Sequence, residues 1–129
     1  MKKHNIQFPP IKTGHLDQDE TYFYLVHDNE KEKMLFHDYD KIYQVQGLYE
    51  QLFYDRLKCV SPRKVTDALK HVIDINRENF SEMRVLDFGA GNGMMGEEIK
   101  KIGVSRLVAV DILEQAKSAT ERDRPGIYD

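Results

Sequence analysis

Glycines at positions 89, 91, 93 and 96 closely follow an apolar run that contains Asp87. Glycine loses more conformational freedom on folding than any other residue, so this cluster needs a structural or chemical reason. A strand that points at the start of a helix leaves unpaired N–H groups and a positive dipole end at the turn. Without side chains at Gly89, Gly91 and Gly93, a ligand can lie against that backbone. The sequence therefore predicts a ligand-binding turn between a strand and a helix.

A second candidate residue, Asp111, lies near the end of the next apolar run, residues 106–112. An acid about 20 residues beyond the glycine turn, at the end of the following strand, can accept hydrogen bonds from both ribose hydroxyls of an adenosine group. Asp111 has this position relative to Gly91. Together the turn and this acid predict an adenosine-containing cofactor.

The identity of that cofactor depends on how the glycines are grouped. Residues 91–96 satisfy G-x-G-x-x-G, the dinucleotide fingerprint, whereas residues 87–93 satisfy D-x-G-x-G-x-G. A pyrophosphate needs the helix N-terminus, and the carboxylate of Asp87 would repel it there. The same carboxylate suits a cofactor with a cationic ammonium or sulfonium end. The second grouping is therefore favoured.

The stretches "RVLDFGAGNGMMGEEI" and "RLVAVDILEQAKSA" resemble motif I and the following acidic motif of class I S-adenosylmethionine-dependent methyltransferases. The resemblance covers about residues 84–119. It implies S-adenosylmethionine as the cofactor and a Rossmann-like doubly wound parallel sheet as the fold. It also implies a set of cofactor-binding residues: Asp87 at the methionine end, the turn Gly89, Ala90, Gly91, Asn92 and Gly93 beneath the cofactor, Asp111 at the ribose, and Ile112 and Leu113 beside the adenine.

Upstream, "HDYDKIY" and "GLYEQLFYDRL" resemble the tyrosine-rich N-terminal helices of the bacterial branch of this superfamily. Those helices commonly cover the cofactor as a lid. The resemblance implies that Tyr43, together with Tyr39 and Asp40, approaches the methionine moiety or the substrate.

Periodicity predicts an α/β chain with three regions. Residues 1–20 are polar and predict an extended N-terminal arm. Residues 21–80 predict a hairpin, with strands at 21–27 and 33–37, and then a helical lid region that Gly47 interrupts. Residues 81–129 predict a strand, glycine turn, helix, strand and helix, the first part of a methyltransferase domain.

Composition excludes several functional classes. The 129 residues carry a formal net charge of −3, which gives no electrostatic case for a nucleic-acid partner. The single Cys59 excludes an intrachain disulfide and fits a reducing compartment. The first residues contain two lysines but no apolar segment typical of a signal peptide, and no apolar run is long enough to cross a membrane, so we expect a cytoplasmic protein. No residue spacing matches a metal-ligand set.

The resemblance ends before the third strand of a methyltransferase sheet. We therefore expect a truncated methyltransferase domain whose open sheet edge could pair with a second copy of the chain. No catalytic base is identified, and the methyl acceptor stays open. Two other functions remain: a fragment of an NAD-dependent oxidoreductase, which requires the G-x-G-x-x-G grouping, and a non-catalytic Rossmann-like interaction module.

Overall fold

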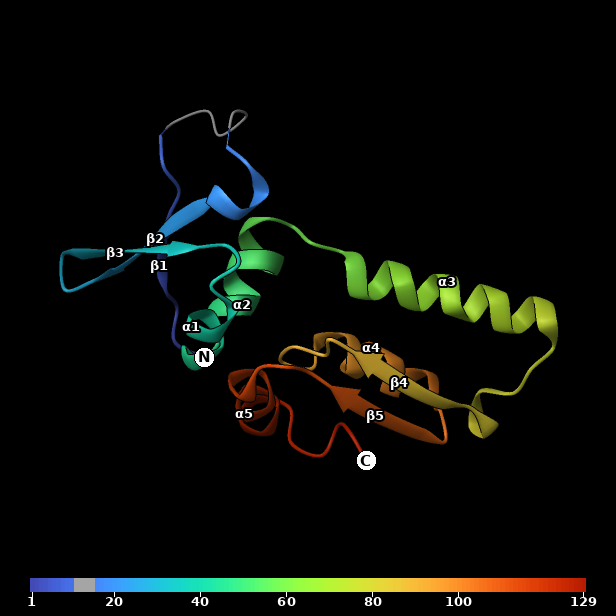
Figure 1. Cartoon of the computed structure of the whole chain (residues 1–129). Coiled ribbons are helices and arrows are strands. Elements are labelled where there is room, and N and C mark those ends of the chain that lie inside the picture. Colours follow the sequence, from blue (N-terminus) through green and yellow to red (C-terminus); the bar gives the residue numbers. More distant parts are fainter. Residues whose placement is uncertain (11–15) are drawn as a thin grey trace. The chain divides into compact units, whose positions relative to one another are not determined.

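The chain divides into two compact units, Met1–Lys58 and Cys59–Asp129 (Figure 1). The computed structural model describes residues 1–10 and 16–129, so residues 11–15 of the expected N-terminal arm lie outside the described residues. The predicted boundary follows residue 80, whereas the two compact units divide after residue 58, so the helix that begins at Ser61 lies in the second unit. The lid role expected of residues 21–80 stays a prediction.

The first unit contains a three-stranded antiparallel sheet in the order β1-β2-β3. Its strands are β1 (Asn5–Gln7), β2 (Tyr22–His27) and β3 (Glu30–Leu35), and a short 3-10 helix (η1, Gln18–Glu20) precedes β2. The predicted hairpin is confirmed, but its loop is shorter than expected. Asp28 and Asn29 adopt positive φ angles of 47° and 67°, which allows a two-residue turn. Strand β1 was not predicted, because residues 1–20 were expected to form an extended arm. It is three residues long and pairs with β2.

Helical turns follow the hairpin. They are α1 (Tyr39–Gln44), α2 (Leu48–Glu50) and a π-helical segment, η2 (Gln51–Arg56). Gly47 has a φ of 75°, a left-handed conformation that favours glycine, and it separates α1 from α2. The predicted interruption of the helix at this glycine is therefore confirmed. These turns and the sheet enclose one apolar core, formed by Ile6, Phe23, Leu25, Met34, Ile42, Leu48 and Leu52.

The second unit contains a strand, turn, helix, strand and helix in the predicted order. Its elements are α3 (Ser61–Asn76), the 3-10 turn η3 (Phe80–Glu82), β4 (Arg84–Phe88), α4 (Met94–Ile102), β5 (Arg106–Val110) and α5 (Glu114–Asp123). Strands β4 and β5 run parallel, with Asp87 opposite Ala109 and Phe88 opposite Val110. The mixed α/β class is thereby confirmed, with one antiparallel and one two-stranded parallel sheet.

The two faces of the parallel sheet differ in burial. Asp87 and Leu107 point into the unit and are buried, whereas Leu86 is 57% exposed and Phe88 is 82% exposed. Since side chains alternate along a strand, Leu86 and Phe88 share the outer face. Helix α3 buries Thr66 and Ile73 and leaves its apolar residues Val65, Val72 and Ile75 exposed.

Candidate functional site

The turn between β4 and α4 has the backbone conformation that only glycine adopts readily. Gly89, Gly91 and Gly93 have φ angles of 77°, 56° and 87°. Each angle lies in the left-handed region, where a side chain would be strained. Glycine at positions 89, 91 and 93 is therefore favoured by the local backbone, whatever ligand the turn binds.

The space beside each glycine differs. A Cβ atom at Gly89 would meet nothing within 4 Å. A Cβ at Gly93 would lie 3.2 Å from Thr120 Cγ2 and 3.3 Å from Arg124 Cδ, and one at Gly96 would overlap the ring of Tyr128. Residues of α5 therefore lie beside the Cβ position of Gly93, whereas the Cβ position of Gly89 is open. The expected contact of a ligand with either glycine stays a prediction.

Most of the turn's backbone donors are already used within the protein. The N–H groups of Gly89 and Ala90 donate to Val110 O at 2.7 and 3.2 Å, and that of Gly93 donates to Ala90 O at 3.0 Å. The N–H of Gly91 donates to Asp111 Oδ2 at 2.8 Å. This turn is therefore held against the end of β5 and offers few donors to a phosphate.

Asp111 is the residue that closes the turn. Its Oδ2 accepts from Gly91, and its Oδ1 accepts from the N–H of Leu113 at 2.9 Å. A carboxylate has about four acceptor positions, so roughly two remain for ligand hydroxyls. The structure thus brings Asp111 and the glycine turn together, as their spacing predicted, and gives Asp111 a structural task as well.

Asp87 lies at the end of β4 and is only 8% exposed. The hydroxyl of Tyr128 donates to Asp87 Oδ2 at 2.7 Å. Burial, followed by this hydrogen bond and the nearby negative charge, raises the pKa of Tyr128 above its usual range. The phenol therefore stays protonated and acts as a neutral donor to a buried carboxylate.

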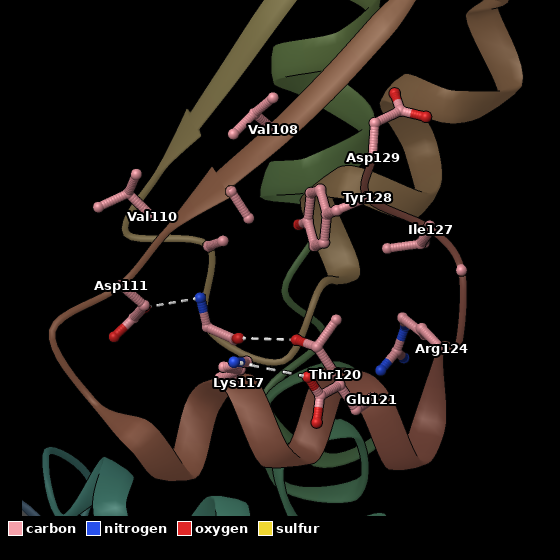
Figure 2. A pocket seen from close by; sticks show the side chains of 14 residues that line it. Val108, Val110, Asp111, Lys117, Thr120, Glu121, Arg124, Ile127, Tyr128 and Asp129 are labelled. Carbon is pink, nitrogen blue, oxygen red and sulfur yellow. Dashed lines mark hydrogen bonds and ion pairs between the residues drawn. The ribbon is translucent and has the colours of Figure 1, made fainter.

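A cavity of about 500 Å³ borders the turn (Figure 2). β5, α5 and the segment 126–129 form its walls, and Ala90, Gly91 and Asp111 are the predicted site residues that line it. Figure 2 shows Val108 and Val110 on one side, Lys117 and Thr120 on another, and Tyr128 facing them. This volume lies within the range of about 300–1,000 Å³ that is typical of small-molecule sites.

Helix α5 contributes polar residues to the cavity that were not predicted as site residues. Lys117, Thr120, Glu121 and Arg124 line the cavity, and their spacing puts them on one helix face. Thr120 Oγ1 donates to Gly91 O at 3.1 Å. This polar stripe was visible in the sequence, but nothing there showed that it faces the glycine turn.

Arg124 fixes the other end of the turn. One guanidinium nitrogen donates to Asn92 O at 3.0 Å, and Nε lies 3.3 Å from Glu97 Oε2. Asn92 is 3% exposed, so this predicted site residue is enclosed by the protein. The arginine charge next to the turn is therefore offset by Glu97.

Two other predicted residues, Ile112 and Tyr43, are not among the residues that line the cavity. Ile112 is 96% exposed, and nothing in the structure covers its side chain. Tyr43 belongs to the first unit, where it is buried and stacks on Tyr39 with ring centroids 6.0 Å apart. Its predicted approach to the cofactor therefore stays a prediction.

Across residues 1–10 and 16–129, no group of three His, Cys, Asp or Glu side chains could hold a metal ion. None of the helices described is long and apolar enough to span a membrane. Compared with known protein families, with curated proteins and with solved structures, the chain matches none.

Proposed function

We propose that the second unit is the cofactor-binding part of an S-adenosylmethionine-dependent methyltransferase and the beginning of a Rossmann-like sheet. The observation that carries this proposal is the hydrogen bond between Gly91 and Asp111 at the ends of two adjacent parallel strands. It places an acid beside a bare glycine turn at the carboxyl edge of the sheet, where ligands of such sheets bind.

The residues present fit the proposed cofactor in three respects. Asp111 retains acceptor positions for ribose hydroxyls, and Gly89 leaves its side of the turn open. Asp87 supplies a buried negative charge for a cationic ligand end. A charge-assisted hydrogen bond of this kind is worth about 1.5–3 kcal/mol.

In this proposal the cofactor supplies an activated methyl group, and the chain supplies binding and alignment. Asp111 holds the ribose in one orientation, and Asp87 attracts the amino-acid end. Holding the reacting partners in line can contribute about 7–11 kcal/mol to the barrier. The methyl acceptor is left open, since no described side chain is assigned to it.

A dinucleotide is the weaker candidate. A pyrophosphate at the turn needs several backbone N–H donors, and those of Gly89, Ala90 and Gly91 are already engaged within the protein. Asp87 would add repulsion. The use of these donors thus supports the cationic cofactor over NAD.

A non-catalytic interaction module is the second candidate, and a different observation favours it. Leu86 and Phe88 lie exposed on the outer face of the parallel sheet, a face that proteins usually cover. Such an apolar surface is typical of a contact with another protein surface. This function requires no ligand in the cavity.

Calorimetric titration with S-adenosylhomocysteine and, separately, with NAD tests the proposal. We expect saturable binding of S-adenosylhomocysteine that Asp111→Ala weakens about tenfold or more, which corresponds to about 1.4 kcal/mol. Glu114→Ala is the matched control because this exposed acid starts α5 outside the cavity lining.

Asp111→Ala also removes two hydrogen bonds that hold the turn, so a second comparison varies the ligand instead. Adenosine should bind the wild-type chain more tightly than 2′,3′-dideoxyadenosine, which lacks the hydroxyls assigned to Asp111. Equal affinities would remove the ribose contact from the proposal. Binding of NAD alone would overturn the choice of cofactor, and binding of neither cofactor would favour the interaction module.

A further inference from the structure

Segment 126–129 lies against the carboxylate to which the proposed function assigns the cationic cofactor end. The donor that the structure gives to Asp87 is the Tyr128 hydroxyl, at 2.7 Å. A neutral hydroxyl satisfies an acceptor position of a buried carboxylate but brings no opposite charge. Asp87 is therefore hydrogen-bonded but not neutralised by this partner.

The position of the Tyr128 ring depends on Gly96. The ring lies where a Cβ atom at Gly96 would be, so it fits there only because Gly96 has no side chain. Gly96 lies inside α4 and has no positive φ, so the helix backbone does not itself require glycine there. The contact with Tyr128 explains this fourth glycine of the cluster.

Beyond Tyr128, the segment is held at Ile127, whose N–H donates to Arg124 O at 3.4 Å, and at Asp129. Asp129 N donates to Leu107 O at 2.8 Å, and Leu107 N donates to Asp129 Oδ2 at 2.7 Å. Lys100 Nζ lies 3.7 Å from Asp129 Oδ1. Gly126, with a φ of 74°, begins the segment. Gly126 and Asp129 are exposed, whereas Ile127 and Tyr128 are half-buried. Solvent-exposed hydrogen bonds such as those at Asp129 open more easily than those of a core.

A cationic ligand group has an advantage over Tyr128 at Asp87. Hydrogen bonds between a charged donor and a carboxylate are about twice as strong as those between neutral groups. A ligand ammonium would provide both the hydrogen bond and the compensating charge. Exchange of the hydroxyl for a cation would therefore favour the ligand.

We propose that residues 126–129 form an autoinhibitory strap whose Tyr128 hydroxyl competes with the cationic end of the cofactor for Asp87. This inference rests on the proposed function and adds a regulation of the same site. The strap leaves Asp87 when the ligand binds, and the Tyr128 ring then moves out of its contact with Gly96. Ligand affinity is thus lowered by whatever free energy holds the strap in place.

The test compares S-adenosylhomocysteine binding by the wild-type chain and by Tyr128→Phe. The phenylalanine keeps the ring against Gly96 but cannot donate to Asp87. We expect affinity to rise about tenfold, the change that corresponds to about 1.4 kcal/mol. Tyr22→Phe, in β2 of the first unit, is the matched control and should leave affinity unchanged.

A second variant removes the contacts that hold the strap at Asp129. Asp129→Ala removes the acceptor for Leu107 N–H and the ion pair with Lys100, and it should also tighten binding, by a few-fold. Nuclear magnetic resonance adds a readout that does not depend on affinity. The ring signals of Tyr128, assigned by their absence from Tyr128→Phe, should move to the values of an exposed tyrosine when ligand is added.

The outcomes separate the two proposals. If the wild-type chain binds the ligand and both variants bind it equally or more weakly, the strap is wrong and the cofactor site stands. Tyr128 signals that stay unchanged at ligand saturation would also overturn the strap. If no chain binds the ligand, the proposed function fails, and the strap fails with it.

Discussion

The two units of the chain use their residues differently. In the first unit, large apolar side chains such as Phe23, Leu25 and Leu52 are fully buried in one core. In the second unit, small residues such as Ala116 and Ala119 occupy buried positions. The buried polar residues of the described chain, Thr66, Asp87 and Asn92, also belong to the second unit.

Both units bury and expose some large apolar residues, but exposed ones are more numerous in the second unit. The second unit exposes Val65, Val72, Ile75, Leu86 and Phe88. The first unit is therefore organised around one apolar core, whereas the second unit combines buried apolar residues with buried polar residues and a larger exposed apolar surface. Thr66 and Asp87 are hydrogen-bonded within the second unit, so the cost of burying their polar groups is offset.

The largest expected effect comes from a matched pair of leucine truncations. Leu25→Ala removes a side chain that is 0% exposed in the core of the first unit, and Leu86→Ala removes one from the outer face of β4. We expect losses in the free energy of unfolding of about 2–5 kcal/mol for the first and less than about 1 kcal/mol for the second. Denaturant unfolding measures both, and equal losses would contradict the described difference between the units.

Glycine substitutions sharpen the comparison within the second unit. Gly93 and Gly103 have nearly the same φ, 87° and 89°, but only Gly93 has α5 beside it. Alanine at Gly103 should cost about 1–2 kcal/mol from backbone strain alone. Alanine at Gly93 must also displace Thr120 or Arg124, and it should cost about 2–4 kcal/mol. Thermal unfolding of the two variants gives the difference, and identical losses would show that α5 does not pack against the turn.

Ionisation of Tyr128 provides a smaller effect, confined to alkaline pH. Its pKa is raised, mainly by burial, so the folded chain keeps this proton at pH values where the unfolded chain loses it. The contribution to stability is therefore complete below about pH 10 and declines as pH rises above it. The free energy of unfolding should fall more steeply above pH 10 for the wild-type chain than for Tyr128→Phe. Parallel pH profiles would contradict the buried contact with Asp87.

Local signals in the sequence predicted the parts of the fold that depend on neighbouring residues. The turn at residues 89–93, the break at Gly47 and the parallel pairing of the strands at 84–88 and 106–110 all follow from short-range patterns. These features confirmed the α/β class. Strand β1 was not predicted because Asn5–Gln7 has no strong strand pattern of its own and forms by pairing with β2.

Most contacts between residues far apart in the sequence could not be predicted from local sequence patterns. Spacing predicted that Asp111 lies near Gly91, since a strand–helix–strand unit brings these positions together. Nothing comparable linked Asp87 to Tyr128, which is 41 residues away. The sequence likewise does not show which side chains lie beside Gly93 and Gly96, which are Thr120 and Arg124 for the first and Tyr128 for the second.

The smallest expected effect concerns the anchor at Asp129. The hydrogen bond from Leu107 N–H, together with Lys100, lowers the pKa of Asp129 below its ordinary value of 3.8. Its contribution to stability is therefore present above that value and is lost as pH falls through the lowered pKa. The Leu107 amide signal should shift in this acidic range in the wild-type chain and not in Asp129→Asn. Because Asp129 is exposed, the change should stay local, and unfolding of the whole second unit in the same range would show that the anchor supports more than segment 126–129.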